Sequence, residues 1–320
     1  MTAGTQVSAP SDLQVSDNYG RPVRSMRLSV TQRCSLACDY CHKEGQTPSR
    51  EEMTPSEIER LVRVAASAGV KKVKLTGGEP LMREDLSEII QRLSRLVSEV
   101  SLTTNGYSLK DNARDLKDAG LNRINVSLHT LNKDVYSRIC GVDMVDSVVR
   151  GIRSAVAAGL APVKVNMVVL KGFNESDIGS MMRFCAETGA VLQLIEYEAS
   201  REGAKEEDFK KRFYSLVGVE EDLRSKAVNI FHNELHRRGR YQVKADGGLV
   251  TVEVVRPMHN TEFCQNCTRI RLSSDGILKP CLMEKSGELD LLRPLRKGAS
   301  DSDLRELFMK GVAARRPYWR

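Results

Sequence analysis

The feature that most restricts the fold of this chain is an alternation of β-rich and helical stretches through its first two thirds. Each short run rich in Val, Ile and Leu is followed by a longer stretch whose apolar residues recur with helical spacing. The β-rich runs are residues 26–30, 73–75, 100–103, 123–128, 163–170 and 191–195. The helical stretches are residues 55–68, 86–97, 110–119, 145–158 and 176–188. Strands that alternate with helices form right-handed βαβ units, so the sequence predicts an α/β fold with a parallel sheet.

The number of these units limits the architecture further. About six βα units are fewer than the eight of a complete TIM barrel, so they fit either a doubly wound sheet or an incomplete barrel. Two helix starts carry capping signals: Thr54 precedes Pro55, and polar residues at 174–177 precede the fifth helix. In both architectures ligands bind at the carboxyl ends of the strands, which is where a site is expected.

The remaining segments have a different character. Residues 1 to 20 are polar and lack apolar periodicity, which predicts a disordered leader. Residues 201–240 are rich in charge and predict two polar helices, with His232 and His236 on the surface of the second. Strands follow at 241–244 and 249–255, a hairpin turns at Asp275-Gly276, and a last helix spans 301–314. We therefore expect a leader (1–20), an α/β domain (21–240) and a C-terminal region (241–320).

Composition limits the classes of function. The chain has 49 basic and 42 acidic residues, and its net charge of +7 favours an anionic partner. No apolar run reaches the length of a membrane span, and residues 1–18 lack the layout of a secretory signal. A cytoplasmic location is therefore expected. Its eight cysteines are then kept reduced, and six of them in two tight groups indicate metal binding.

The first cysteine group comprises Cys34, Cys38 and Cys41, directly after the first β-rich run. Three thiolates on one short loop can hold three irons of a [4Fe–4S] cluster and leave the fourth iron open to another ligand. A zinc site with His42 as the fourth ligand is the alternative, because structural zinc prefers four protein ligands.

The second group comprises Cys264, Cys267 and Cys281, and zinc completed by His259 is again the alternative reading. Arg269 and Arg271 follow Cys267 at strand spacing, so their side chains point to the same face. Two guanidinium groups beside a metal site form a clamp suited to phosphates, whereas two solvated surface arginines are the alternative.

Two motifs together resemble the radical S-adenosylmethionine (SAM) superfamily. The spacing Cys-x3-Cys-x2-Cys carries an aromatic residue, Tyr40, before its last cysteine, and Gly-Gly-Glu-Pro at 77–80 follows the second β-rich run. The resemblance implies that a reduced [4Fe–4S] cluster gives one electron to SAM. The resulting 5′-deoxyadenosyl radical then abstracts hydrogen from a substrate.

Residues 263–282 resemble the GTP 3′,8-cyclase family, also called molybdenum cofactor biosynthesis protein A, and residues 103–107 and 123–128 agree with it. The resemblance implies an incomplete (β/α)6 barrel of the TIM type, closed by a C-terminal extension that carries a second [4Fe–4S] cluster. That cluster would bind the purine of GTP. The implied product is (8S)-3′,8-cyclo-7,8-dihydroguanosine 5′-triphosphate.

The resemblance also implies partners. These are an electron donor such as a flavodoxin or ferredoxin, a downstream cyclic pyranopterin monophosphate synthase and a second copy in a homodimer. Neither a membrane nor a nucleic acid is expected as a partner.

The same resemblance assigns site residues one by one. The six cysteines of the two groups would hold the clusters. SAM would contact Tyr40, Gly78, Glu79 and Ser127. GTP would contact Arg27, Lys74, Thr103, Lys164, Arg269, Ile270 and Arg271.

Three departures from the family pattern stand out. Lys74 replaces an arginine, so the charge remains but the bidentate geometry does not. Glu198 stands where the family has a methionine that helps to hold SAM. The chain ends in Pro-Tyr-Trp-Arg at 317–320 instead of a Gly-Gly tail.

Two other functions remain open at this point: a radical SAM maturase that modifies peptides, and a zinc-ribbon protein that binds RNA. Among the other residues, Cys140 and Cys185 are predicted to be small core residues and His129 a structural histidine. The basic runs 236–238 and 315–316 are predicted to be solvated.

Overall fold

The structure is a computed structural model that describes residues 15–49, 51–232, 235–284 and 286–319. Most of the expected leader therefore lies outside the described residues. Residues 15–20 do not continue the expected disorder, because Ser16 pairs with Pro22 and the Asp17 carboxylate accepts hydrogen bonds from the Tyr19 and Arg21 amides.

Six parallel strands form the centre of the molecule, and neighbours in the chain are neighbours in the sheet. They are β1 (Ser25–Ser29), β2 (Lys72–Thr76), β3 (Glu99–Thr104), β4 (Arg123–Ser127), β5 (Val163–Val169) and β6 (Val191–Glu196). This order lacks the reversal of a doubly wound sheet, so the fold is the incomplete barrel. All six strands match the predicted β-rich runs to within one or two residues at each end.

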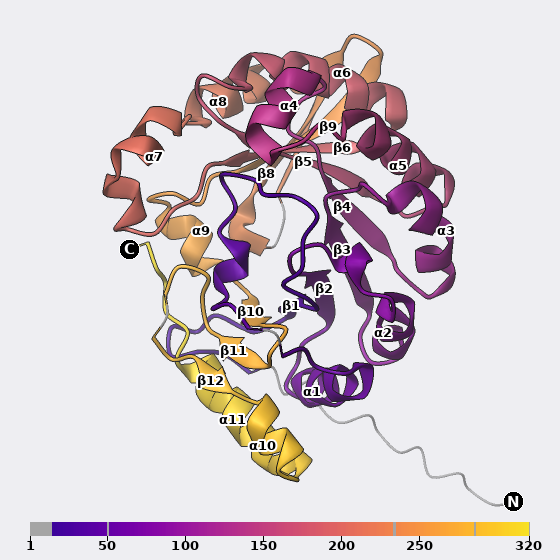
Figure 1. Cartoon of the computed structure of the whole chain (residues 1–320). Helices are drawn as coiled ribbons and strands as arrows, with labels where there is room; N and C mark the ends of the chain where they lie inside the picture. The colour runs from indigo at the N-terminus through magenta and orange to yellow at the C-terminus, as the bar shows by residue number, and fades with distance from the viewer. Residues whose placement is uncertain (1–14, 50, 233–234, 285, 320) are drawn as a thin grey trace, which may run out of the picture.

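Helices surround the outside of this curved sheet (Figure 1). They are α1 (Pro55–Ser67), α2 (Leu86–Ser94), α3 (Leu109–Asp118), α5 (Val145–Ala157) and α6 (Ile178–Thr188). The Thr54 side chain caps α1 as predicted. The predicted cap of α6 is wrong, because the Asn174 amide instead bonds to the backbone of Leu170 and of His129.

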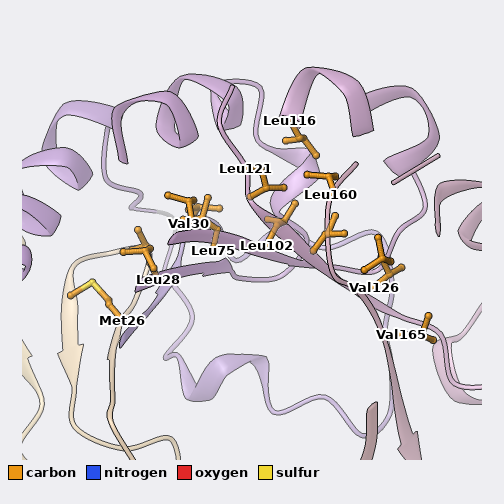
Figure 2. Packing of buried hydrophobic residues seen from close by; sticks show 14 of the residues in the cluster. Met26, Leu28, Val30, Leu75, Leu102, Leu116, Leu121, Val126, Leu160 and Val165 are labelled. Carbon is orange, nitrogen blue, oxygen red and sulfur yellow. The ribbon is translucent and has the colours of Figure 1, made fainter. Parts of the chain in front are cut away.

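The strands alternate in a way that places the core on one side of the sheet only. Met26, Leu28 and Leu75 are buried and point toward the helices, as Figure 2 shows. Arg27 lies between Met26 and Leu28, and Lys74 directly precedes Leu75. Because successive strand residues face opposite sides, Arg27 and Lys74 point to the inside of the barrel. The barrel interior is polar for this reason.

The C-terminal third extends both edges of the six-stranded sheet. At one edge β9 (Gly248–Val255) lies parallel to β6 and is followed by β8 (Gly239–Ala245) and β7 (Asn229–His232). At the other edge β10 (Arg269–Leu272) lies parallel to β1 and is followed by β11 (Ile277–Lys279) and β12 (Leu289–Asp290). The segment from 256 to 268 connects the two edges, so the extension closes the open side of the barrel.

Shorter elements complete the structure: α4 (Lys133–Cys140), α7 (Glu207–Arg212), α8 (Val217–Lys226), α9 (Thr261–Gln265), α10 (Leu292–Arg296) and α11 (Asp301–Ala313). The sequence predicted α7, α8 and α11 but not α4, α9, α10 or β7. The prediction that His232 and His236 share a helix is wrong, since α8 ends at Lys226 and His232 lies on β7. Among the described residues, no helix combines the length and apolar character needed to cross a bilayer.

Candidate active site

A cavity of about 380 Å³ opens inside the barrel and brings both cysteine groups together. All six of these cysteines line it, and every one is a free thiol. The predicted residues that line it besides the cysteines are Arg27, Tyr40, Lys74, Gly78, Thr103, Ser127, Lys164, Arg269 and Arg271. Segments more than 200 residues apart in sequence therefore share one chamber.

Two predicted residues do not line this cavity. Ile270 is fully buried on the opposite face of β10 from Arg269 and Arg271. The Glu79 carboxylate is turned toward the end of the neighbouring strand β3, where it accepts hydrogen bonds from the Thr104 hydroxyl and the Asn105 amide, each at 2.6 Å. Neither side chain therefore faces the cavity.

The first cysteine group lies on the loop that follows β1. Backbone amides point at two of its sulfurs, from Leu36 to Cys34 at 3.5 Å and from Lys43 to Cys41 at 3.3 Å. A hydrogen bond from the Cys140 thiol lowers the pKa of Cys38. Cys140 is buried as predicted, but it also lines the cavity, a role the sequence did not indicate because α4 was not predicted.

The two glycines of the Gly-Gly-Glu-Pro motif allow the loop after β2 to touch the first cysteine loop. A Cβ atom at Gly77 would lie 2.3 Å from the Thr31 carbonyl oxygen, and one at Gly78 would lie 2.2 Å from that of Arg33. The Gly78 amide donates to the Thr31 carbonyl at 2.8 Å. No larger residue fits here, so the motif has a packing reason in addition to any ligand contact.

His129 supports the aromatic residue of the first group. Its Nδ1 accepts a hydrogen bond from the Val168 amide at 3.1 Å, which leaves the proton on Nε2, 2.6 Å from the Tyr40 hydroxyl. Burial lowers the pKa of His129 to about 4, so the ring is neutral. His129 is hydrogen-bonded as predicted, but it also lines the cavity, so the structure places it at the site as well.

The second cysteine group is held by both ends of the described chain. Arg21 donates to the Cys264 carbonyl at 2.8 Å, Arg315 donates to that of Cys267, and the Trp319 amide points at the Cys264 sulfur at 3.4 Å. Arg315 is only 1% exposed, so the prediction that it is solvated is wrong.

His236 and Arg238 were also predicted to be solvated, and they are buried or nearly so. The His236 ring stacks on Phe263 with centroids 3.6 Å apart, and Arg238 pairs with Glu253 at 2.9 Å. Both line the cavity.

The structure shows no preformed single-ion site: among the described residues, no three His, Cys, Asp or Glu side chains are close enough to share one metal ion. Each group instead presents three free thiols to the cavity, a donor set that fits an iron–sulfur cluster with one iron left open.

The cavity wall is strongly cationic. Ten arginine and lysine side chains line it against three glutamates. The cations are Arg21, Arg27, Lys74, Arg123, Lys164, Arg238, Arg269, Arg271, Arg315 and Arg316. Burial, together with Arg271 and Arg27, lowers the pKa of Arg269 to about 9. Burial also lowers the pKa of Lys164 to about 8, although Glu253 opposes the shift.

Two carboxylates that the sequence did not single out neutralise part of this charge. Glu253 is fully buried and bonds to Lys164, Arg238 and Gln193. Glu44 pairs with Arg27 and Arg271. Burial alone would raise the pKa of Glu44, but the two arginines and His42 lower it to about 2. Neither residue belongs to a motif, and only the fold brings their partners to them.

Comparisons with known proteins agree with this site. Residues 28–185 match the model of the radical SAM superfamily, and residues 190–320 match the Molybdenum Cofactor Synthesis C model. A probable GTP 3′,8-cyclase of Pyrococcus horikoshii is 52% identical over 303 residues, which cover 95% of this chain and 97% of the relative. A probable GTP 3′,8-cyclase of Thermococcus kodakarensis is 50% identical over 305 residues, which cover 95% and 99%.

Solved structures show the same fold at low sequence identity. Streptococcus suis SuiB bound to its precursor peptide SuiA superimposes with a TM-score of 0.66 at 18% identity, over 92% of this chain and 67% of that one. SuiB bound to S-adenosylmethionine superimposes with a TM-score of 0.59 at 16% identity, over 92% and 70%. At this identity the likeness concerns the fold alone.

Proposed function

Since the chain belongs to the GTP 3′,8-cyclase family of the radical SAM superfamily, we propose that its cavity holds GTP between the two cysteine groups. The activity is that of a radical SAM GTP 3′,8-cyclase in molybdenum cofactor biosynthesis. The product that the chemistry implies is (8S)-3′,8-cyclo-7,8-dihydroguanosine 5′-triphosphate.

The observation that carries the proposal is the cationic wall of a chamber lined by six thiols: ten cations line it, and its three glutamates, together with Glu253 and Asp17 behind the wall, balance only part of that charge. A triphosphate supplies the negative charge that such a wall needs, because buried cations without counterions are costly. A peptide backbone would not, which disfavours the peptide-modifying maturase. The family membership replaces the zinc-ribbon reading.

The cofactors are two [4Fe–4S] clusters and SAM. Cys34, Cys38 and Cys41 would hold the first cluster, which supplies the one-electron reduction of SAM when bound. Cys264, Cys267 and Cys281 would hold the second. The backbone amides of Leu36, Lys43 and Trp319 would donate hydrogen bonds to the sulfurs of Cys34, Cys41 and Cys264.

The other assignments divide between the two ligands. For SAM we assign Tyr40, Gly78 and Ser127 as contacts and Glu79 as the residue that holds the Gly77–Gly78 loop in place. For GTP we assign Arg27, Lys74, Thr103, Lys164, Arg269 and Arg271. The Arg269–Arg271 pair would hold the triphosphate, and Ile270 anchors that strand in the core.

The partners and the location follow from the same proposal. A flavodoxin or ferredoxin would donate electrons, and a cyclic pyranopterin monophosphate synthase would consume the product, with a homodimer in the cytoplasm as the working form. Residues 21–240 would form the partial barrel and residues 241–320 the cluster-bearing extension.

The direct test is anaerobic reconstitution with iron and sulfide, followed by reaction with SAM, dithionite and GTP. We expect 5′-deoxyadenosine and a GTP-derived product that keeps its triphosphate. If 5′-deoxyadenosine forms while GTP is left unchanged, the assignment of GTP as the substrate is wrong. That result would favour the alternative, a maturase that modifies peptides.

A sharper test removes the clamp. Arg269→Ala combined with Arg271→Ala should weaken GTP binding by about 3–6 kcal/mol, because two charge-assisted contacts are lost. Isothermal titration of the reconstituted protein measures this affinity. Arg114→Ala with Arg153→Ala removes the same charge from exposed helix positions and should leave the affinity unchanged. An unaltered affinity in the clamp variant would remove the assignment.

A further inference from the structure

Glu44 lies at the centre of the cationic wall and occupies the position of an anion. Its Oε1 is 2.7 Å from Nη2 of Arg27 on β1, and its Oε2 is 2.7 Å from Nη1 of Arg271 on β10. The Thr76 hydroxyl on β2 donates to Oε1 at 3.1 Å. The carboxylate is thus bonded from three adjacent strands, and its side chain is 11% exposed.

Other donors on the same wall remain open. The Arg269 guanidinium lines the cavity beside the Cys267 thiol, and no carboxylate among the described residues pairs with it. Nε of Arg27 is buried and also lacks a partner there. The clamp therefore contains one internal anion and retains donors that a further anion can satisfy.

Glu44 also connects the two halves of the site. It belongs to the 3-10 turn η1 (Lys43–Gly45), which begins two residues after Cys41. The Lys279 ammonium donates to the Gly45 carbonyl, and the Ser274 amide donates to the Gln46 side chain at 3.0 Å. The turn thus joins the first cysteine loop to the β10–β11 hairpin, which lies between Cys267 and Cys281.

We propose that Glu44 is a stand-in anion, which compensates Arg27 and Arg271 in the absence of substrate and is displaced when a triphosphate binds. The proposal rests on the proposed function, since it takes a nucleoside triphosphate as the substrate. Phosphate oxygens and a carboxylate compete for the same guanidinium hydrogens, and the two arginines need one counterion in either state. Displacement would break the link from Glu44 to Arg271 on β10, while the bonds of Lys279 to Gly45 and of Ser274 to Gln46 keep the turn on the β10–β11 hairpin.

The test compares the anion affinity of single variants of the reconstituted full chain under anaerobic conditions without SAM. The probe is inorganic tripolyphosphate, measured by isothermal titration. Glu44→Gln should bind it about tenfold more tightly than the wild type, because the internal competitor is gone. Glu44→Asp is too short to reach both arginines and should lie between the two.

Glu198→Gln is the matched control. Glu198 also lines the cavity, but it makes no ion pair with either arginine among the described contacts. The Glu198→Gln variant removes the same charge from the same chamber without breaking a pair with Arg27 or Arg271. Its tripolyphosphate affinity should therefore change much less than that of Glu44→Gln. An equal gain in tripolyphosphate affinity in both variants would mean that the net charge of the cavity sets the affinity and that Glu44 is not displaced. That result overturns the proposal.

The remaining outcomes also decide the question. If Glu44→Gln binds tripolyphosphate equally well or more weakly than the wild type, Glu44 stays in place and only orients the arginines. If the wild type binds neither tripolyphosphate nor GTP, the proposed function fails instead. If Glu44→Gln does not retain its clusters, Glu44→Asp must still bind more tightly than the wild type.

Discussion

At the scale of single residues, the site is built from the alternation of side chains along each strand. Arg27 faces the cavity while Met26 and Leu28 on either side of it pack under the helices. Arg271 lies between Ile270 and Leu272 in the same way. One face of each strand supplies stability and the other supplies charge, so cations can gather inside without entering the apolar core.

Glu196 gives a pH-dependent prediction at this scale. Burial raises the pKa of this carboxyl to about 7, above its value near 4.3 in the unfolded chain. The folded state therefore binds the proton more tightly, and the stability that this adds is present below about pH 4 and is lost as the pH rises through 7. Glu196→Gln carries no titratable carboxyl at this position, so the variant does not lose this stability as the pH rises. Relative to the wild type, its free energy of unfolding should rise by about 1–3 kcal/mol between pH 5 and pH 8.

Urea unfolding at a series of pH values measures this difference. Glu187→Gln, in the last turn of α6, is a control in which the two curves should run in parallel. Parallel curves for Glu196→Gln as well would contradict the raised pKa.

At the scale of elements, short connections determine where the functional strands can lie. The β10–β11 hairpin carries Arg271 on one strand and leads to Cys281 on the other. Its turn contains Gly276 at a φ of +78°, where a Cβ atom would lie 2.4 Å from Cβ of Leu292. The turn is therefore restricted both by its backbone conformation and by the close approach of α10.

A comparison of two glycines with nearly the same φ distinguishes the effect of backbone conformation from the effect of close packing. Gly172 has a φ of +76° and nothing within 4 Å of its Cβ position. Gly172→Ala should cost about 1–2 kcal/mol for the left-handed conformation alone. Gly276→Ala should cost about 1–3 kcal/mol more, because the methyl group also overpacks against Leu292. Urea unfolding of both variants tests this, and equal losses would show that the contact with α10 adjusts freely.

At the scale of the whole molecule, segments from both ends of the chain meet behind the second cysteine group. The Asp17 carboxylate is buried and pairs with Arg21 at 2.8 Å and with Arg315 at 3.4 Å. Those two arginines bond to the carbonyls of Cys264 and Cys267. The Asp17 carboxylate therefore holds the backbone of the second cysteine group through Arg21 and Arg315, two arginines nearly 300 residues apart in sequence.

Asp17→Asn tests this arrangement. Loss of a buried partner of two arginines should reduce the free energy of unfolding by about 3–5 kcal/mol. Iron and sulfide should also be lost from the second cluster, while SAM cleavage at the first continues. Asp301→Asn breaks the more exposed pair between Arg60 and α11 and should cost less than about 1 kcal/mol. Full retention of both clusters in Asp17→Asn would show that the carboxylate is not needed to hold the second group.

Local pattern was enough to predict the barrel strands, their helices and the β10–β11 hairpin, because periodicity and turn chemistry depend on neighbours in sequence. The short elements α4, α9 and β7 were missed, since few residues express a period and tertiary packing stabilises them. The cysteine spacings and the paired arginines were likewise readable, because each is a feature of one short segment.

The sequence by itself determined that Arg269 and Arg271 share one face of their strand, and it predicted which cysteines would hold a cluster. Only the tertiary structure decided that Glu44 pairs with Arg27 and Arg271, that Arg315 is buried behind Cys267, and that His236 stacks on Phe263. The reason is physical: burial and ion pairing depend on which distant segments meet, and a charged residue in a linear sequence looks the same whether it faces water or a buried partner.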